Sequence, residues 1–280
     1  MRQGLRLLVA GERYRRIEGQ TTGRSMSFVP TSARSSSMIN RTSVPLVLLH
    51  AFPLDARMWD AQVAALEQTG YETIAPNLPG REPDNDLAHW AGRVLQLLAG
   101  DFIPVGCSMG GYLIFELWRQ ASARIPAAVF IDTRAGADTP EVREGRDETI
   151  RILGEDGFDA FWKLQEPKLF GPDASPDVVE RARAIAAEQP ITNLVATIQA
   201  LGSRPDSRET ASSMGIPALV IVGEDDVLTP PSEAEELAEL LPVAQLFSLP
   251  GAGHLTPLEQ PAQVDEELIV FLSHAAPAQP

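Results

Sequence analysis

Cysteine and lysine are both scarce in this chain. Among 280 residues there is one cysteine, Cys107, and there are two lysines, Lys163 and Lys168. A single cysteine excludes an intrachain disulfide and is typical of a reducing compartment, so a cytoplasmic location is predicted. The few histidines and the one cysteine do not form clusters with metal-ligand spacing, so neither a metal nor an organic cofactor is predicted. The chain also lacks an apolar run of the ~20 residues that a membrane span needs, so no membrane partner is expected.

Positive charge is in excess only in the N-terminal stretch. The whole chain has 23 basic and 38 acidic residues, a net charge of −15. Residues 1–41 hold eight Arg and two Glu, a net +6, so the remainder holds 15 basic and 36 acidic residues, a net −21. So acidic a domain repels phosphate backbones, which excludes nucleic acid as an expected partner. Residues 1–41 are interpreted as a disordered extension or as sequence upstream of the true start, Met26 or Met38. An edge hairpin of the main sheet and a transit-like leader are the alternatives.

Strand and helix patterns alternate over most of the remaining chain. The hydrophobic fraction of 44% allows a full core, and short apolar runs typical of buried parallel strands are separated by helical spacing and Gly or Pro turns. Such alternation predicts an α/β fold with a mostly parallel sheet and helices on both faces. The six strands are expected near 44–49, 71–75, 102–105, 127–131, 218–222 and 244–249.

One stretch interrupts the alternation with helical patterns alone. Four helices are expected there, at 142–153, 158–164, 177–188 and 192–201, with turn residues between them. An all-helical stretch between two core strands is interpreted as a cap. The predicted division is therefore an N-terminal extension at 1–41, a core at 42–137 and 206–274, and a helical cap at 138–205.

The run 106–110 reads Gly-Cys-Ser-Met-Gly and matches the pattern G-x-S-x-G around Ser108. It follows a predicted strand and precedes a predicted helix, which is the context of a nucleophile on a sharp turn. Glycines two residues before and after the serine remove side chains that would collide. The helix N-terminus would direct N–H groups at a developing oxyanion. The alternative interpretation is a glycine-rich turn with a spare serine.

Cys107 is the rival nucleophile in this turn. It precedes the apex by one residue, so its side chain is expected to point into the protein. Its more ordinary role is that of a small buried hydrophobic residue.

A serine nucleophile needs a base, and His254 is the favoured candidate. It follows the last predicted strand in a loop whose glycines would bring the imidazole over the strand ends. The other histidines are His50, His89 and His274. His50 is expected to order the loop after the first strand by hydrogen bonds, His89 to lie on a surface helix, and His274 in the tail.

The acid that orients this base is expected after the fifth strand, in the run 222–230. Asp226 is the favoured residue. Asp225, next to it, and Asp132, at the end of the fourth strand, remain alternatives.

From about residue 45 to 272 the chain resembles the α/β-hydrolase superfamily. The segments that carry the resemblance occur in the family's order and are 48–55, 77–80, the Ser108 turn, 223–230 and 251–254. The order Ser, Asp, His along the chain is also that of this superfamily. The chain is most similar to the branch of cofactor-free haloperoxidases and perhydrolases, small esterases and 3-oxoadipate enol-lactonases.

The resemblance implies a serine hydrolase that acts on a small, mainly apolar ester or lactone through an acyl-enzyme. It places the oxyanion hole at the backbone N–H groups of Phe52 and Met109. Two departures bear on that hole: Ala51 stands where the family usually has Gly, and the sequence after Gly80 differs from the family pattern. If Ala51 needed a positive φ it would be strained.

Aromatic residues supply the candidate pocket walls. Trp59, Tyr112, Phe161 and Trp162 are predicted to line the substrate pocket, although packing of the cap against the core is the alternative for each. The expected partners are a small-molecule substrate and a second copy in a homodimer. Perhydrolysis or C–C bond hydrolysis on the same three residues, and a non-catalytic ligand receptor, are the other function classes.

Overall fold

A single parallel sheet forms the centre of the molecule. The computed structural model describes residues 6–9, 44–79 and 84–275. Within these residues the sheet has seven strands in the order β1-β7-β6-β5-β4-β2-β3, and every neighbouring pair is parallel. The strands are β1 (Arg6–Val9), β2 (Leu46–Leu49), β3 (Thr73–Ile74), β4 (Ile103–Cys107), β5 (Ala128–Ile131), β6 (Pro217–Gly223) and β7 (Val243–Leu249). The six predicted strands and the α/β class are confirmed, and β1 adds a parallel edge strand where a hairpin was the alternative.

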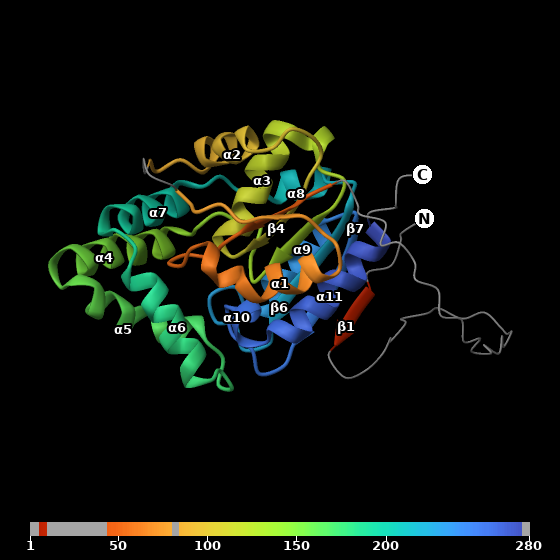
Figure 1. Cartoon of the computed structure of the whole chain (residues 1–280). Coiled ribbons are helices and arrows are strands. Elements are labelled where there is room, and N and C mark those ends of the chain that lie inside the picture. Colours follow the sequence, from red (N-terminus) through yellow and green to blue (C-terminus); the bar gives the residue numbers. More distant parts are fainter. Residues whose placement is uncertain (1–5, 10–43, 80–83, 276–280) are drawn as a thin grey trace, which may run out of the picture.

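Both faces of the sheet are covered by helices (Figure 1). On β2, Val47 and Leu49 face one hydrophobic cluster and Leu46 and Leu48 the other, so every residue of the strand is buried. This explains the continuous apolar run in the sequence. One face carries α2 (Leu87–Gln96), α3 (Met109–Ala121), α8 (Arg208–Ser213) and α9 (Pro231–Leu240); the other carries α1 (Asp60–Gln68), α10 (Thr256–Glu259) and α11 (Pro261–Ala275).

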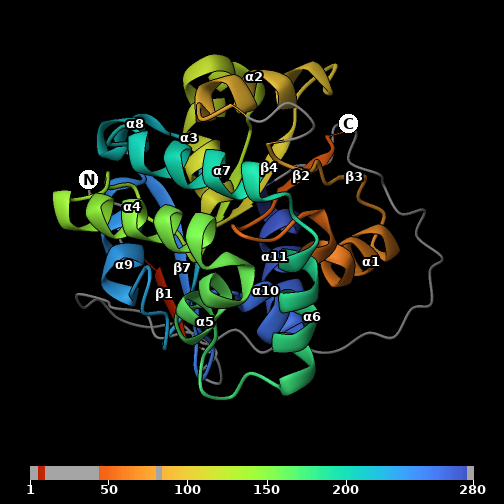
Figure 2. The same ribbon diagram turned by 90° about the vertical axis from the view of Figure 1, so that its left-hand side faces the viewer.

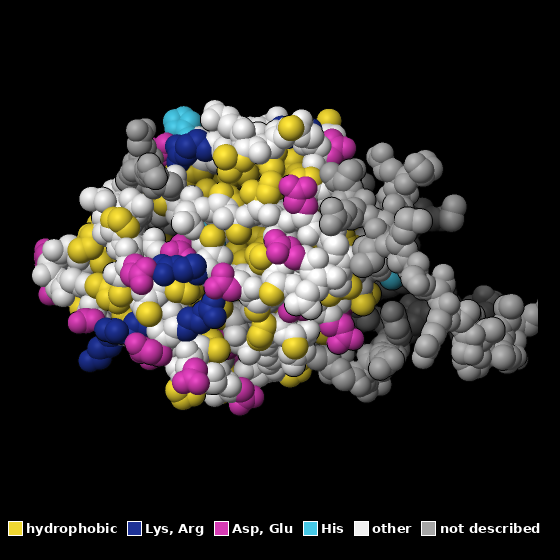
Figure 3. Space-filling view, viewed as in Figure 1, with side chains coloured by type: hydrophobic (Ala, Val, Ile, Leu, Met, Phe, Trp, Pro, Cys, Tyr) yellow, Lys and Arg dark blue, Asp and Glu magenta, His cyan; other side chains and the backbone are white. Residues whose placement is uncertain are grey.

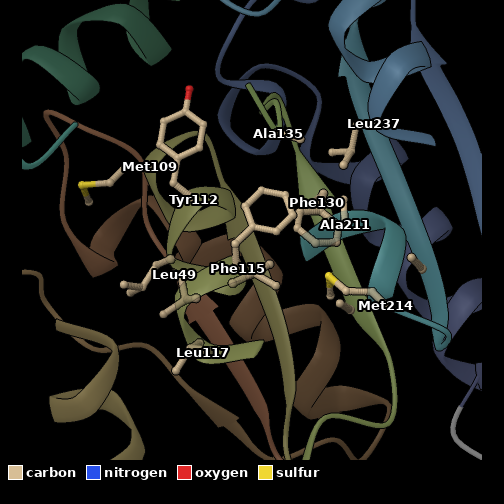
Figure 4. Close-up of a cluster of buried hydrophobic side chains, with 14 of the residues drawn as sticks. Leu49, Met109, Tyr112, Phe115, Leu117, Phe130, Ala135, Ala211, Met214 and Leu237 are labelled. Atoms are coloured by element: carbon tan, nitrogen blue, oxygen red, sulfur yellow. The ribbon is translucent and has the colours of Figure 1, made fainter. Parts of the chain in front are cut away.

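Helix α3 is anchored by its packing on the central strands. Phe115 of α3 stacks on Phe130 of β5 with ring centroids 5.1 Å apart. Figure 4 shows these rings side by side, while the Tyr112 ring points away from them. This packing fixes the position of α3 on the sheet, and with it the residues at the N-terminal end of the helix.

Four helices lie between β5 and β6 in the chain and form the helical insertion: α4 (Pro140–Glu155), α5 (Gly157–Leu169), α6 (Pro176–Ala187) and α7 (Ile191–Ser203). Thr139 and Ser175 cap α4 and α6 by accepting hydrogen bonds from backbone N–H groups two residues beyond the proline that starts each helix. Figure 2 shows the four helices together in front of the sheet. They match the four helices expected from the sequence.

The surface carries no concentrated acidic patch on the face drawn in Figure 3, where the Asp and Glu side chains are scattered. None of the helices within the described ranges combines the length and hydropathy that a membrane crossing requires.

Candidate active site

Ser108 lies on a tight turn between β4 and α3. Its backbone has φ 51° and ψ −108°, a conformation that L-residues rarely adopt. The turn requires glycine on both sides. A Cβ on Gly106 would lie 2.4 Å from the carbonyl of Gly110, and a Cβ on Gly110 would lie 2.0 Å from the carbonyl oxygen of Leu49 in β2. The expected steric reason for the two glycines is confirmed, with β2 as an additional contact that the sequence did not indicate.

Ser108, His254 and Asp226 come together although they lie far apart in the chain. His254 Nε2 is 2.8 Å from Ser108 Oγ, and His254 Nδ1 is 2.7 Å from Asp226 Oδ2. An ionised carboxylate can only accept hydrogen bonds, so Nδ1 carries the proton that is donated to Asp226. Nε2 is then left to accept from the Ser108 hydroxyl.

The Asp226 carboxylate is held by several donors. Burial by itself would raise the pKa of Asp226, but His254 and Thr229 outweigh it and the pKa lies below its ordinary value. The Thr229 hydroxyl donates to Oδ2 at 2.7 Å, and the amides of Leu228 and Thr229 donate to Oδ1. Asp226 is therefore ionised and fixed in orientation. Thr229 is not among the residues predicted from the sequence. The only signal that could have suggested it is its position three residues after the acid.

The two alternative acids lie elsewhere. Asp225 is exposed, and its amide donates to Ala252. Asp132 is buried and accepts hydrogen bonds from the amide of Gly223 and from the amide and hydroxyl of Thr256. It thus ties the end of β6 to the start of α10, and makes no hydrogen bond to His254 among the described residues.

Cys107 points away from the turn, as expected. Its thiol is fully buried and donates to Asp132 at 3.8 Å. Burial, followed by the charges of Asp132 and Asp226, raises the pKa of Cys107 well above its ordinary value. The thiolate that a cysteine nucleophile needs is therefore strongly disfavoured.

A single carboxylate organises the loop that carries His254. Glu259 accepts hydrogen bonds from the amides of Gly253, Leu255 and Gly171. Gly171 follows α5, so the helical insertion and this loop share one acceptor. The amide of His254 also donates to the carbonyl of Leu169 in α5 at 3.1 Å.

The loop after β2 contains Phe52 and is ordered by His50. Burial lowers the pKa of His50, so the ring is neutral. Its Nε2 accepts from the amide of Leu78 at 2.9 Å, and Nδ1 donates to the carbonyl of Ala51. The predicted ordering role of His50 is confirmed.

Ala51 does not have the positive φ that would strain it, because the only non-glycine residues with positive φ in the described ranges are Ser108 and Asp132. Residues 80–83, the other departure from the family pattern, lie outside the described residues.

A cavity of about 370 Å³ opens above Ser108 and His254. Phe52 and Tyr112 line it, together with apolar residues of the helical insertion such as Ile198 and Leu201. Met109 lines a small adjoining pocket that also touches Phe52. The cavity is large enough for a small organic substrate.

The other predicted wall residues pack elsewhere and do not line this cavity in the part of the chain that is described. Trp59 is fully buried in the core beneath α1. Phe161 meets Phe52 edge-on at 5.9 Å, and Phe158 stacks on Trp162 at 6.2 Å. Phe161 thus joins the helical insertion to the loop of Phe52, and Trp162 packs in the buried hydrophobic cluster, which is the packing alternative considered for both.

Comparison with known proteins agrees with the fold described above. A family model described as "Alpha/beta hydrolase family" matches residues 46–267. The pimeloyl-[acyl-carrier protein] methyl ester esterase of Nitrosomonas europaea is 28% identical over 233 residues, which cover 78% of this chain and 91% of that protein. A putative non-heme chloroperoxidase of Synechocystis sp. is 27% identical over 253 residues, covering 81% and 91%.

Among solved structures, a thermophilic esterase from Thermogutta terrifontis, with malate bound, has a TM-score of 0.78 and 31% identity, covering 84% of this chain and 92% of that one. The resemblance seen in the sequence is confirmed. Since the family match spans most of its length, the chain belongs to the alpha/beta hydrolase family and is a hydrolase enzyme.

Proposed function

We propose that Ser108, His254 and Asp226 form a catalytic triad that hydrolyses a small carboxylic ester or lactone through an acyl-enzyme. One observation carries the proposal. An unbroken line of hydrogen bonds runs from Asp226 through His254 to Ser108, whose hydroxyl faces a cavity of substrate size. The esterase relatives support the ester as substrate class.

The chemistry follows from the order of these contacts. His254 Nε2 takes the Ser108 proton as Oγ attacks the substrate carbonyl, and Asp226 stabilises the imidazolium that forms. The tetrahedral intermediate collapses, and the leaving alkoxide takes the proton from Nε2. Water then attacks the acyl-enzyme with His254 as base, and the intermediate releases the acid and restores the Ser108 hydroxyl.

The oxyanion is assigned in this proposal to the amides of Phe52 and Met109. Met109 is the first residue of α3, so its N–H lies at the positive end of the helix dipole. The His50 hydrogen bonds to Ala51 and Leu78 order the loop that carries Phe52, and the Phe52 ring packs against Phe161. Loss of one such donor typically costs about 3 kcal/mol of transition-state stabilisation.

A fluorophosphonate probe and p-nitrophenyl butyrate test the nucleophile. The wild-type protein is expected to be labelled and to release p-nitrophenol, whereas Ser108→Ala should do neither. Cys107→Ala serves as the matched control one residue away, and it should keep both properties. If the wild-type chain is not labelled, or if Ser108→Ala is labelled equally well, the triad proposal fails. A non-catalytic ligand receptor would then be the better-supported function.

Perhydrolysis is the second candidate, and the chloroperoxidase relative favours it. The carboxylic acid would acylate Ser108 with release of water, and hydrogen peroxide would then attack the acyl-enzyme in place of water and release a peracid. Acetate with peroxide should then yield peracetic acid in a reaction that depends on Ser108. If esters are hydrolysed but no peracid forms, perhydrolysis is rejected and the esterase proposal stands.

A further inference from the structure

The charged side chains that line the catalytic cavity, apart from His254, are all cations. Arg134, Arg146 and Lys168 contribute to its wall, and among the described residues no Asp or Glu side chain does. This is unexpected in a chain of net charge −15. We propose that these cations bind a carboxylate on the substrate, so that the preferred ester or lactone is an anion. This inference rests on the proposed function and narrows its substrate class.

Lys168 has no protein partner to neutralise it. It forms no ion pair or hydrogen bond with any residue that the structure describes. Its neighbour Leu169 accepts the amide hydrogen bond of His254, which fixes the end of α5 beside the base. Lys168 itself is exposed and lines the cavity into which Ser108 opens, so its ammonium group is free to pair with an anion there.

The two arginines belong to a cluster in which positive charge is in excess. The buried carboxylate of Asp138 accepts from Arg134 at 3.0 Å, from Arg204 at 2.6 Å and from Arg146. Burial would raise the pKa of Asp138, but Arg146 and Arg204 outweigh it and lower the pKa. Glu233 adds a second acid at 3.5 Å from Arg134. Two carboxylates thus face three guanidinium groups, with Lys168 as a fourth cation.

One donor in this cluster is left without an acceptor. Arg134 Nε is buried and has no hydrogen-bond partner among the described residues. A buried donor of this kind is costly, and because Nε is closed to solvent, a ligand in the cavity would reach it only if neighbouring side chains moved. A carboxylate in the cavity matches the geometry and charge of the guanidinium groups of the arginines that line it.

The other residues that line the cavity indicate the chemistry of the uncharged part of the substrate. Val142, Ile198 and Leu201 contribute apolar wall to the same cavity. A short methylene chain with an ester at one end and a carboxylate at the other satisfies both regions. Because Arg134 and Arg146 are partly buried, with side chains 15% and 22% exposed, salt screens them less than it screens surface charges.

Matched ester pairs test this specificity. The first pair is the p-nitrophenyl monoester of adipic acid and its neutral terminal amide. The second pair is 4-carboxyphenyl hexanoate and 4-carbamoylphenyl hexanoate, which place the charge on the alcohol side. In at least one pair, kcat/KM should favour the anion, and the preference should shrink as NaCl rises. Relative to kcat/KM for the neutral partner ester, Lys168→Gln should lower kcat/KM for that anion about 3-fold, and Arg146→Gln about 10-fold.

Lys163→Gln is the matched control, because Lys163 is an exposed lysine on the same helix that does not line the cavity. It should change none of the four rates. The inference is overturned if the anion is preferred in neither pair, or if Lys163→Gln and Lys168→Gln have equal effects. Labelling of Ser108 by fluorophosphonate is measured on the same samples. A labelled enzyme without anion preference refutes this inference alone, whereas an unlabelled one refutes the proposed function.

Discussion

At the scale of single residues, the structure gives different environments to adjacent residues that the sequence alone leaves as alternative site candidates. Asp225 and Asp226 are adjacent, yet one side chain is exposed and the other is buried against His254. Cys107 and Ser108 are likewise adjacent, and only the serine faces the cavity. Position on a turn, not residue type, decides which side chain can do chemistry.

Asp226→Asn should lower kcat by about 10⁴-fold, because an amide would favour the wrong imidazole tautomer while leaving the fold intact. The measurement is kcat for p-nitrophenyl butyrate, with circular dichroism to confirm folding. Asp225→Asn is the matched control, and its exposed position predicts a change of no more than about twofold. Equal losses in the two variants would reject Asp226 as the orienting acid.

At the scale of elements, charge pairs connect the helical insertion to the core. Asp138, which precedes α4, pairs with Arg146 on α4, with Arg204 after α7 and with Arg134 after β5. Its side chain is completely buried, so removal of its charge would leave arginines uncompensated. Breaking a buried pair in this way generally costs about 3–5 kcal/mol.

Asp138→Asn should therefore lower the free energy of unfolding by about 3 kcal/mol at pH 7. The folded pKa of Asp138 lies below its ordinary value, so its stabilisation is present above about pH 4 and is lost as pH falls through the folded pKa. The difference in free energy of unfolding between wild type and variant should stay constant from pH 7 to 5 and narrow below 4, as measured by urea denaturation. Asp147→Asn, an exposed change on α4, should produce no such gap. A gap that does not depend on pH would contradict the assignment.

Much of this arrangement follows from local patterns. The apolar runs predicted the strands and the G-x-S-x-G pattern predicted the sharp turn at Ser108, because these depend on residues adjacent in sequence. Trp59 shows the limit, since an aromatic residue after the first strand suits a pocket wall and a core equally well. Thr229, Glu259 and the arginine cluster escaped prediction because their partners lie on elements distant in sequence, and only packing brings them together.

At the scale of the whole molecule, every site residue described above lies outside the N-terminal stretch 1–41. The site residues from His50 to Glu259 lie within the family match at 46–267, and the described part of residues 1–43 contributes β1 at the sheet edge. The N-terminal interpretations other than this strand fall on residues outside those described. A cytoplasmic location and a homodimer stay predictions.

A chain that begins at Met38 should therefore keep kcat/KM for p-nitrophenyl butyrate within about twofold of the full chain. Loss of β1 removes four residues of pairing along β7, so the unfolding midpoint should fall by about 4 °C or less. Enzyme assay and thermal melting of both chains check this. A large loss of activity would assign the N-terminal stretch a part in the site. Aggregation of the short chain would instead show that β1 protects the edge of β7.

The shared acceptor at Glu259 has a consequence for turnover. Its carboxylate joins the turn after α5 to the loop of His254, and the backbones there are so close that a Cβ on Gly253 would lie 2.3 Å from the Gly171 nitrogen. Raising α5 to admit a substrate would break these bonds and shift the imidazole. If His254 is the base, opening in this way would stop catalysis, so we expect substrate entry and product exit through the mouth of the cavity with α5 in place.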